Sequence, residues 1–219
     1  MKITEISGIF ENGMWSYGSP FPAVEIKPVS SIDKEGVSVH SIFLSTISGT
    51  YLETGAHLFK NEITVDQIPL EKLVVDAAII KLTKDKNERE HITVKDLEQY
   101  PVDIKAGDAL LIHTGWDRMW NKKNFVLDSP HFTKESMEWI LSKNISILGA
   151  DLPCYDDPQA GSLTTELSLL EKMFKKGALV LAPLVNLASI SKTRAKLVVL
   201  PLHIKDVSGA PCRAIVIED

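Results

Sequence analysis

Four short apolar runs in the middle of the chain constrain its fold more than any other feature. They are residues 73–82, 109–112, 145–148 and 179–181. Runs that are apolar at nearly every consecutive position are typical of strands buried on both faces of a sheet. The four runs therefore predict at least four interior strands.

Helical patterns separate these runs. Residues 133–144 place Met137, Ile140 and Leu141 on one helical face, and residues 164–176 do the same with an apolar stripe that ends before Gly177. Thr93 and Asp96 have the spacing of a capping box and predict a further short helix. Alternation of strand and helix predicts an α/β fold with a mixed sheet and central helices.

The two ends of the chain are richer in strand signals. Residues 36–47 alternate in the manner of a strand with two different faces, and residues 197–202 and 214–217 are apolar. The first 35 residues are rich in Gly, Pro and Ser, which predicts loops with short strands. No linker interrupts the pattern, so residues 1–219 are expected to form a single domain with a strand-rich N-terminal part.

Composition narrows the functional classes. The formal net charge of −5 argues against nucleic acid and anionic membranes as partners. Cys154 and Cys212 are the only cysteines, a usage expected of a reducing compartment. The sequence contains neither a signal-peptide pattern nor an apolar run of the roughly 18 residues that a membrane helix needs. A cytoplasmic protein with no membrane contact is the expectation.

The stretch at residues 45–59, STISGTYLETGAHLF, gathers the side chains with the clearest chemical potential. Tyr51 and Glu53 project from the same side of an extended segment, and a turn at Gly55 could bring His57 beside them. Glu53 could then hold the imidazole in one tautomer, and His57 could act as a general base on water. Tyr51 could donate a hydrogen bond to a developing oxyanion. The alternative is a buried hydrogen-bond network that satisfies only itself.

Several segments together resemble the cyclase family, which includes bacterial kynurenine formamidase and isatin hydrolase. The family pattern His-x-Gly-Thr-His-x-Asp-x-Pro-x-His lies in register with residues 47–57. Residues 107–116 resemble its Gly-Asp…Thr-Gly-Trp strand and turn, and residues 147–153 resemble its Gly-Ile-Asp-Thr-Pro segment. Residues 181–187 lie where the family has Val-Glu-Asn-Leu-x-Asn-Leu. The resemblance implies the cyclase-like fold, a hydrolase and a homo-oligomer.

Family members bind a divalent metal, often zinc or manganese. The resemblance implies which residues of this sequence stand at the positions of the family's metal ligands. The first two histidines of the pattern correspond to Ile47 and Tyr51, and the aspartate corresponds to Glu53. The later helix histidine falls near Leu169 or Leu170, and the glutamate becomes Ala182. His57 matches the last histidine of the pattern, to which the family assigns proton transfer.

Glu53 and His57 are thus the only retained candidates for metal ligands. A catalytic zinc usually takes three protein ligands, so we expect either no metal or a weakly bound zinc or manganese ion. A rebuilt site that uses Asp151, Asp156, Asp157 or Cys154 is the other alternative.

Further residues are candidates for binding the substrate. Trp116 and Trp120 flank a loop that leaves a buried strand, a usual place for pocket walls, and Asp151 ends another strand. Packing is the alternative role for both tryptophans. His113 is expected to be structural, and Cys154 has no neighbour in sequence that would activate it as a nucleophile.

Two functions remain open. The first is hydrolysis of a small amide, lactam or lactone with catalytic His57, Glu53 and Tyr51. The second is a catalytically silent family member that binds a small metabolite or a paralogous subunit.

Overall fold

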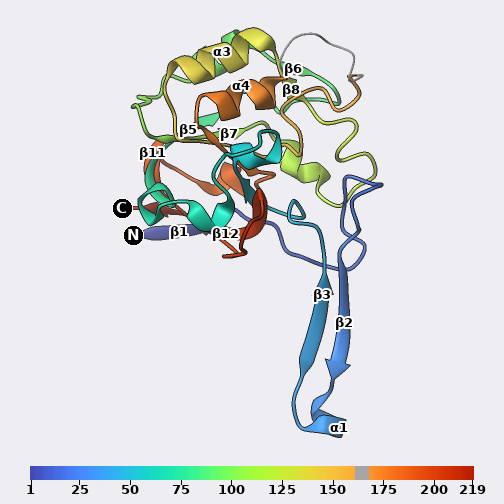
Figure 1. The fold of residues 1–219 in the computed structure, drawn as a ribbon. Helices are drawn as coiled ribbons and strands as arrows, with labels where there is room; N and C mark the ends of the chain where they lie inside the picture. Colours follow the sequence, from blue (N-terminus) through green and yellow to red (C-terminus); the bar gives the residue numbers. More distant parts are fainter. Residues whose placement is uncertain (161–167) are drawn as a thin grey trace.

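The chain folds around one large mixed sheet that closes on itself (Figure 1). The structure is a computed structural model, which describes residues 1–160 and 168–219. Its strands are β1 (Lys2–Glu5), β2 (Glu25–Ser30), β3 (Val39–Phe43), β4 (Tyr51–Glu53), β5 (Val74–Lys81), β6 (His91–Ile92), β7 (Ala109–His113), β8 (His131–Phe132), β9 (Ile147–Ala150), β10 (Leu179–Ala182), β11 (Arg194–Pro201) and β12 (Gly209–Glu218). Its α-helices are α1 (Ile32–Glu35), α2 (Val94–Glu98), α3 (Lys134–Ser142) and α4 (Leu169–Lys175).

Strand β4 closes the sheet. The order along the sheet is β1-β12-β11-β5-β7-β9-β10-β4, and β4 pairs in addition with β12. Glu53 lies opposite Val180 of β10 on one edge and opposite Gly209 of β12 on the other. A strand of three residues, Tyr51–Glu53, therefore has partners on both edges.

Alternation along the strands divides the apolar residues into two cores. Ile79, Leu111 and Leu181 belong to the cluster enclosed by the closed sheet, which also contains Leu52 of β4. Their neighbours, such as Ile80 and Leu110, belong to a second cluster on the outer face. Burial on both faces explains why these strands read as continuous apolar runs, and the predicted mixed sheet is confirmed.

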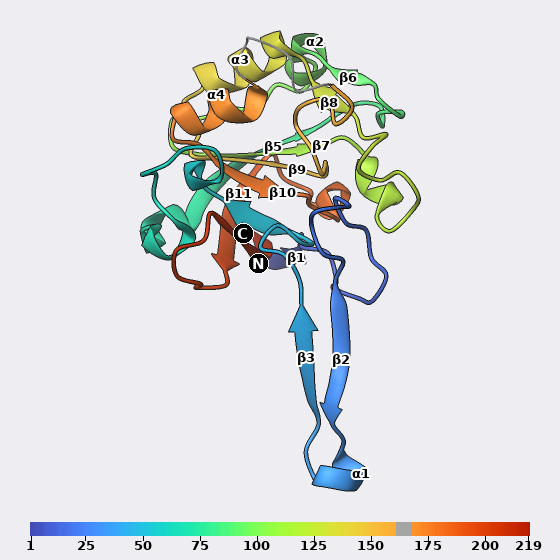
Figure 2. The ribbon, with the colours of Figure 1, turned by 45° about the vertical axis from the view of Figure 1, so that its right-hand side comes forward.

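Helices α2, α3 and α4 cover the outer face of the central strands (Figure 2). Met137 and Ile140 of α3 and Met173 and Phe174 of α4 are buried there. Thr93 and Asp96 form the predicted capping box at α2, and Gly177 follows α4 with a left-handed φ of 74°. The predicted helix over residues 164–176 is observed from Leu169; residues 164–167 lie outside the described part of the chain.

The strand predicted over residues 36–47 differs from the observed structure. Only Val39–Phe43 form a strand, and every residue of it is exposed. With β2 it makes a hairpin, here called the arm (residues 25–43), which projects from the body of the molecule (Figures 1 and 2). The alternating pattern identified a strand correctly but gave no information about what covers it.

A buried carboxylate connects the ends of β7 and β9. Asp151 is fully buried, and its two oxygens accept hydrogen bonds from the backbone N–H groups of Thr114, Gly115 and Trp116 and from the Thr114 hydroxyl, at 2.8–3.1 Å. These bonds fix the turn that leaves β7 against the end of β9. Within residues 1–160 and 168–219, each helix falls short of the length and apolar character needed to cross a membrane.

Candidate functional site

A cavity of about 260 Å³ lies on the outer face of the sheet beside β4. Strand β4 contributes Tyr51 and Glu53, β10 contributes Val180 and Ala182, and α4 contributes Leu170. The other residues that line it are Tyr17, Phe21, Ile47, His57, Pro153, Cys154, Tyr155, Asp156 and Pro158.

Sequence positions far apart in the chain meet in this cavity. The positions matched above to the family's metal and proton-transfer residues line it: Ile47, Tyr51, Glu53, His57, Ala182 and, of the two candidates for the helix position, Leu170. The fold thus brings the predicted catalytic residues Tyr51, Glu53 and His57 together, while their catalytic role stays a prediction.

Local structure explains how His57 reaches the strand. Gly49 begins the approach with φ of 62°, and a Cβ there would lie 2.4 Å from the Phe10 ring, so only glycine fits. After β4 the chain turns into a 3₁₀ helix, Gly55–His57, capped by the Thr54 hydroxyl, which accepts from the Ala56 N–H at 3.3 Å. The Thr54 hydroxyl also donates to the Ser208 carbonyl at 3.1 Å, which anchors this turn to the chain before β12.

Glu53 and His57 form an ion-pair contact. His57 Nδ1 lies 2.9 Å from Glu53 Oε1, and the side chains are 31% and 4% exposed respectively. Glu53 Oε1 has no other partner among the described residues. Bonding and attraction to Glu53 raise the pKa of His57 above its usual 6.5, although partial burial opposes this shift. With Nδ1 held against Glu53, His57 presents Nε2 as the free ring nitrogen.

Two tyrosines continue the polar wall of the cavity. Tyr51 Oη lies 2.8 Å from Tyr17 Oη, and Tyr17 Oη donates to the Pro153 carbonyl at 2.7 Å. Burial, together with neighbouring groups that include Glu53, raises the pKa of both phenols well above 10. Both hydroxyls therefore keep their protons at neutral pH.

The donor set of this cavity does not fit a resident metal ion. Ile47, Leu170 and Ala182 offer no ligand atoms, and a protonated phenol such as Tyr51 is a poor ligand. Burial and the nearby Asp156 raise the pKa of Cys154 to about 12, so this thiol stays protonated. Among the described residues that line the cavity, Glu53, His57 and Asp156 remain, and Asp156 already accepts two backbone N–H groups of α4. Two free ligands are fewer than the three protein ligands of a catalytic zinc site.

A second group of candidate ligands lies elsewhere, at the ends of β7 and β9. His113, Asp117 and Asp151 place one ligand atom each within 4.8 Å of one another. However, all four acceptor positions of Asp151 are filled by the donors of the Thr114–Trp116 turn. Asp117 Oδ2 accepts the Asn186 N–H at 3.0 Å. A metal ion here would have to displace hydrogen bonds that hold the fold.

The other carboxylates considered for a rebuilt site are also engaged. Asp156 accepts the N–H groups of Leu169 and Leu170 at the start of α4, at 2.7 and 3.1 Å. Asp157 pairs with Arg89 at 3.0 Å. Both carboxylates thus have structural partners.

The three residues predicted to bind substrate lie outside the cavity. Asp151 is fully buried in its turn, and Trp116 is 1% exposed with its Nε1 donating to the Phe125 carbonyl at 2.9 Å. Trp120 packs edge-on against Trp15, with ring centroids 5.6 Å apart. The sequence predicted a pocket wall here because a strand end is followed by a Thr-Gly-Trp turn. In the structure the Asp151 carboxylate accepts hydrogen bonds from that turn, and the rings of Trp116 and Trp120 pack in or against the apolar core.

Sequence reasoning missed Tyr17 and Phe21, which line the cavity from the N-terminal segment. This segment carries no motif, and its position depends on contacts with residues far along the chain, such as Pro153. No local sequence signal could have identified these two residues.

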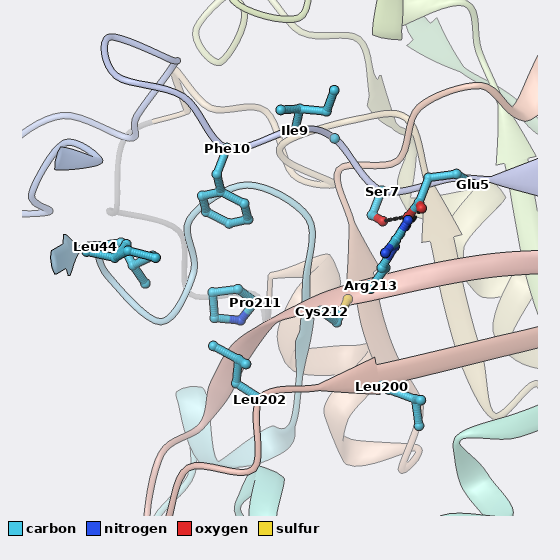
Figure 3. Close-up of a pocket in the computed structure, with 12 residues that line it drawn as sticks. Glu5, Ser7, Ile9, Phe10, Leu44, Leu200, Leu202, Pro211, Cys212 and Arg213 are labelled. Carbon is cyan, nitrogen blue, oxygen red and sulfur yellow. Dashed lines mark hydrogen bonds and ion pairs between the residues drawn. The ribbon is translucent and has the colours of Figure 1, made fainter. Parts of the chain in front are cut away.

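A larger groove of about 590 Å³ lies at the root of the arm (Figure 3). Its wall is mostly apolar, with Phe10, Leu44, Leu202 and Pro211 facing one another, whereas Arg213 bonds Glu5 at 2.7 Å. Burial raises the pKa of Cys212, the thiol in this groove. The groove thus offers apolar surface without a base comparable to His57.

The Glu53–His57 contact predicts a pH dependence. Because the folded protein raises the pKa of His57, the stabilisation from this pair is complete below about pH 6.5 and is lost as the pH rises through the higher folded value. Glu53→Gln should lower the pKa of His57, as followed by NMR of the histidine ring protons. Glu25→Gln on the arm is the control and should leave the titration unchanged. An unshifted His57 in Glu53→Gln would contradict the assignment.

Comparisons with known proteins identify relatives along most of the chain. An isatin hydrolase of Roseibium aggregatum is 25% identical over 212 residues, covering 89% of this chain and 81% of that protein. A kynurenine formamidase of Bacillus thuringiensis subsp. konkukian is 25% identical over 202 residues, covering 92% and 90%.

Solved structures show the same fold. A crystal structure of an isatin hydrolase bound to the product analogue thioisatinate superposes with a TM-score of 0.86 at 22% identity, covering 99% of this chain and 92% of that one. A structure described as a potential metal-dependent hydrolase with cyclase activity gives a TM-score of 0.76 at 20% identity, covering 100% and 98%. The family described as "Putative cyclase" matches residues 4–157. The chain therefore belongs to the cyclase family.

Proposed function

We propose that this protein is a hydrolase of a small amide, lactam or lactone, with the cavity beside β4 as its active site. The observation that carries the proposal is the buried Glu53 carboxylate 2.9 Å from His57 Nδ1, on the wall of a cavity with few other polar groups. Relatives named isatin hydrolase and kynurenine formamidase support the substrate class.

The pair supports a base-catalysed hydrolysis. With its Nδ1–H directed at Glu53, neutral His57 uses Nε2 to take a proton from water as the water oxygen attacks the substrate carbonyl carbon. The resulting imidazolium is stabilised by Glu53 and returns the proton to the leaving nitrogen or oxygen as the bond to carbon breaks. Glu53 thus orients the base and offsets its charge, the arrangement expected when a third group positions a catalytic histidine.

Metal takes no part in these steps. Solved structures with this fold include proteins described as metal-dependent hydrolases, but Ile47, Leu170 and Ala182 leave this cavity short of ligands. We propose that zinc or manganese binds weakly at Glu53 and His57 if it binds at all.

The same apolar residues favour a second candidate function. A family member that has lost its ligands could use the cavity to hold a small metabolite without turning it over, or could pair with a paralogous subunit. Assays of isatin and N-formylkynurenine, each with and without added manganese or zinc, separate this function from hydrolysis. Binding without turnover under every condition supports the silent alternative.

Substitution of His57 tests the catalytic proposal. His57→Ala should lower turnover by about 10²-fold or more, the usual contribution of a general base. The free energy of unfolding should fall by only about 1–3 kcal/mol, because the buried Glu53 carboxylate loses its partner while the protein stays folded. His203→Ala, in an exposed loop, is the matched control and should retain turnover. Full turnover by folded His57→Ala would contradict the proposed base.

We also propose that the chain self-associates through the arm. A two-stranded hairpin alone in water is at best marginally stable, yet four of the six residues of β2 and all of β3 are exposed apart from their pairing with each other. Ile42 and Phe43 are 62% and 61% exposed. Apolar surface of this kind marks an interaction site.

The groove at the arm's root is continuous with this surface. Ile42 lines the groove. Leu44, Leu200 of β11 and Leu202, which follows β11, line it as well (Figure 3). A second copy of the chain offers the same arm and the same groove, so a two-fold pair could cover both at once through an isologous contact.

Light scattering after size exclusion tests the pairing. The wild-type chain should elute with the mass of an oligomer, and Phe43→Asp should shift it toward the monomer because a charge would enter the apolar contact. Asp103→Lys, on the exposed surface of the body, should keep the wild-type mass. A wild-type monomer at micromolar concentration would contradict the proposed pairing.

A further inference from the structure

A chain of hydrogen bonds fixes the polarity of one wall of the cavity. It runs from Tyr51 Oη to Tyr17 Oη at 2.8 Å and from Tyr17 Oη to the Pro153 carbonyl at 2.7 Å. Ring contacts hold Tyr17 in place, since Trp15 and Phe21 pack edge-on against it with centroids 5.3 and 6.1 Å away.

The direction of this chain follows from counting protons. A carbonyl oxygen can only accept, so the single hydroxyl proton of Tyr17 points at Pro153. Two hydroxyl oxygens 2.8 Å apart need a proton between them, and Tyr51 must supply it. Tyr51 has therefore used its only donor, and its oxygen can serve the cavity only as an acceptor.

This result differs from the role predicted for Tyr51 from sequence. A phenol whose proton is committed to Tyr17 cannot at the same time donate to an oxyanion in the cavity. The other polar side chains that line the cavity are mostly acceptors: Glu53 and Asp156 are carboxylates, and His57 in its base form offers the Nε2 lone pair. The Tyr155 hydroxyl donates its proton to the Leu148 carbonyl at 3.0 Å. Cys154 adds only the weak donor of a thiol.

We propose that Tyr17 is a specificity-determining residue that holds the Tyr51 hydroxyl as an acceptor, so that the cavity selects ligands with an N–H donor. A secondary amide or a lactam satisfies the Tyr51 oxygen. An ester or lactone of the same shape places a second acceptor against it and leaves the buried phenol oxygen unpaired, which costs binding. The inference rests on the proposed function for the location of the substrate, and it narrows the substrate class to N–H amides.

Indole and benzofuran provide an inert pair of probes. They have the same fused-ring shape and differ in an N–H against a ring oxygen, and neither is hydrolysed. Affinities from ligand-observed NMR therefore report the selection without turnover. Wild-type protein should bind indole about tenfold more tightly than benzofuran. This is the scale expected when the Tyr51 oxygen accepts a hydrogen bond from one probe and none from the other.

Two variants separate the role of Tyr17 from that of Tyr51. In Tyr17→Phe the Tyr51 proton is free to turn into the cavity, so benzofuran should bind more tightly and the preference for indole should disappear. In Tyr51→Phe the preference should also disappear, but through weaker indole binding and with no gain for benzofuran. Tyr100→Phe, outside the cavity, should keep the wild-type ratio.

Equal affinity of the wild-type protein for both probes, absence of binding by either probe, or an unchanged ratio in Tyr17→Phe would overturn the inference. Melting curves of each variant show whether a loss of the indole preference reflects a loss of folding. Tyr51→Phe repeats the test at the second tyrosine of the hydrogen-bond chain. Absence of turnover with an intact indole preference would count against the hydrolase proposal alone.

Discussion

The pairing of β4 with two strands at once is the constraint on which the candidate site depends. Because β10 and β12 both pair with this three-residue strand, its register is fixed from both edges. Leu52 then points into the enclosed core, whereas Tyr51 and Glu53 point to the outer face and line the cavity. A slip by one residue would bury the carboxylate among leucines and expose Leu52, which the apolar core strongly disfavours.

The cavity that results is lined by positions that the family resemblance connects with metal binding and proton transfer. Ile47, Leu170 and Ala182 contribute apolar side chains to its wall. In such surroundings a charge is costly unless it is paired, and Glu53 has His57 as its neighbour. The hydrogen bond to Tyr17 fixes the direction in which the Tyr51 hydroxyl donates. The pKa of His57 and the hydrogen-bonding role of Tyr51 are thus both set by neighbouring side chains.

The parts of this structure that could be predicted are those recorded in local patterns. Consecutive apolar residues indicated strands buried on both faces, as β5 and β7 are, and the spacing of Tyr51, Glu53 and His57 indicated that they could meet. Closure of β4 onto β12 could not be predicted, because it joins segments about 160 residues apart that carry no shared signal. Asp151 and Trp116 do not line the cavity, which the sequence could not show, because a strand-end carboxylate and an aromatic residue look alike whether they bind a substrate or fasten a turn. Exposure of the arm could not be predicted either, since alternation does not show what covers a strand.

The central claim is that Glu53 and His57 hydrolyse a small amide without a metal ion. The most direct measurement is turnover of isatin and N-formylkynurenine by protein dialysed against a chelator, with its zinc and manganese content determined on the same sample. The account predicts turnover that persists at well under one equivalent of metal and does not rise when manganese or zinc is added. Turnover that vanishes with the chelator and returns with one equivalent of either ion would contradict it.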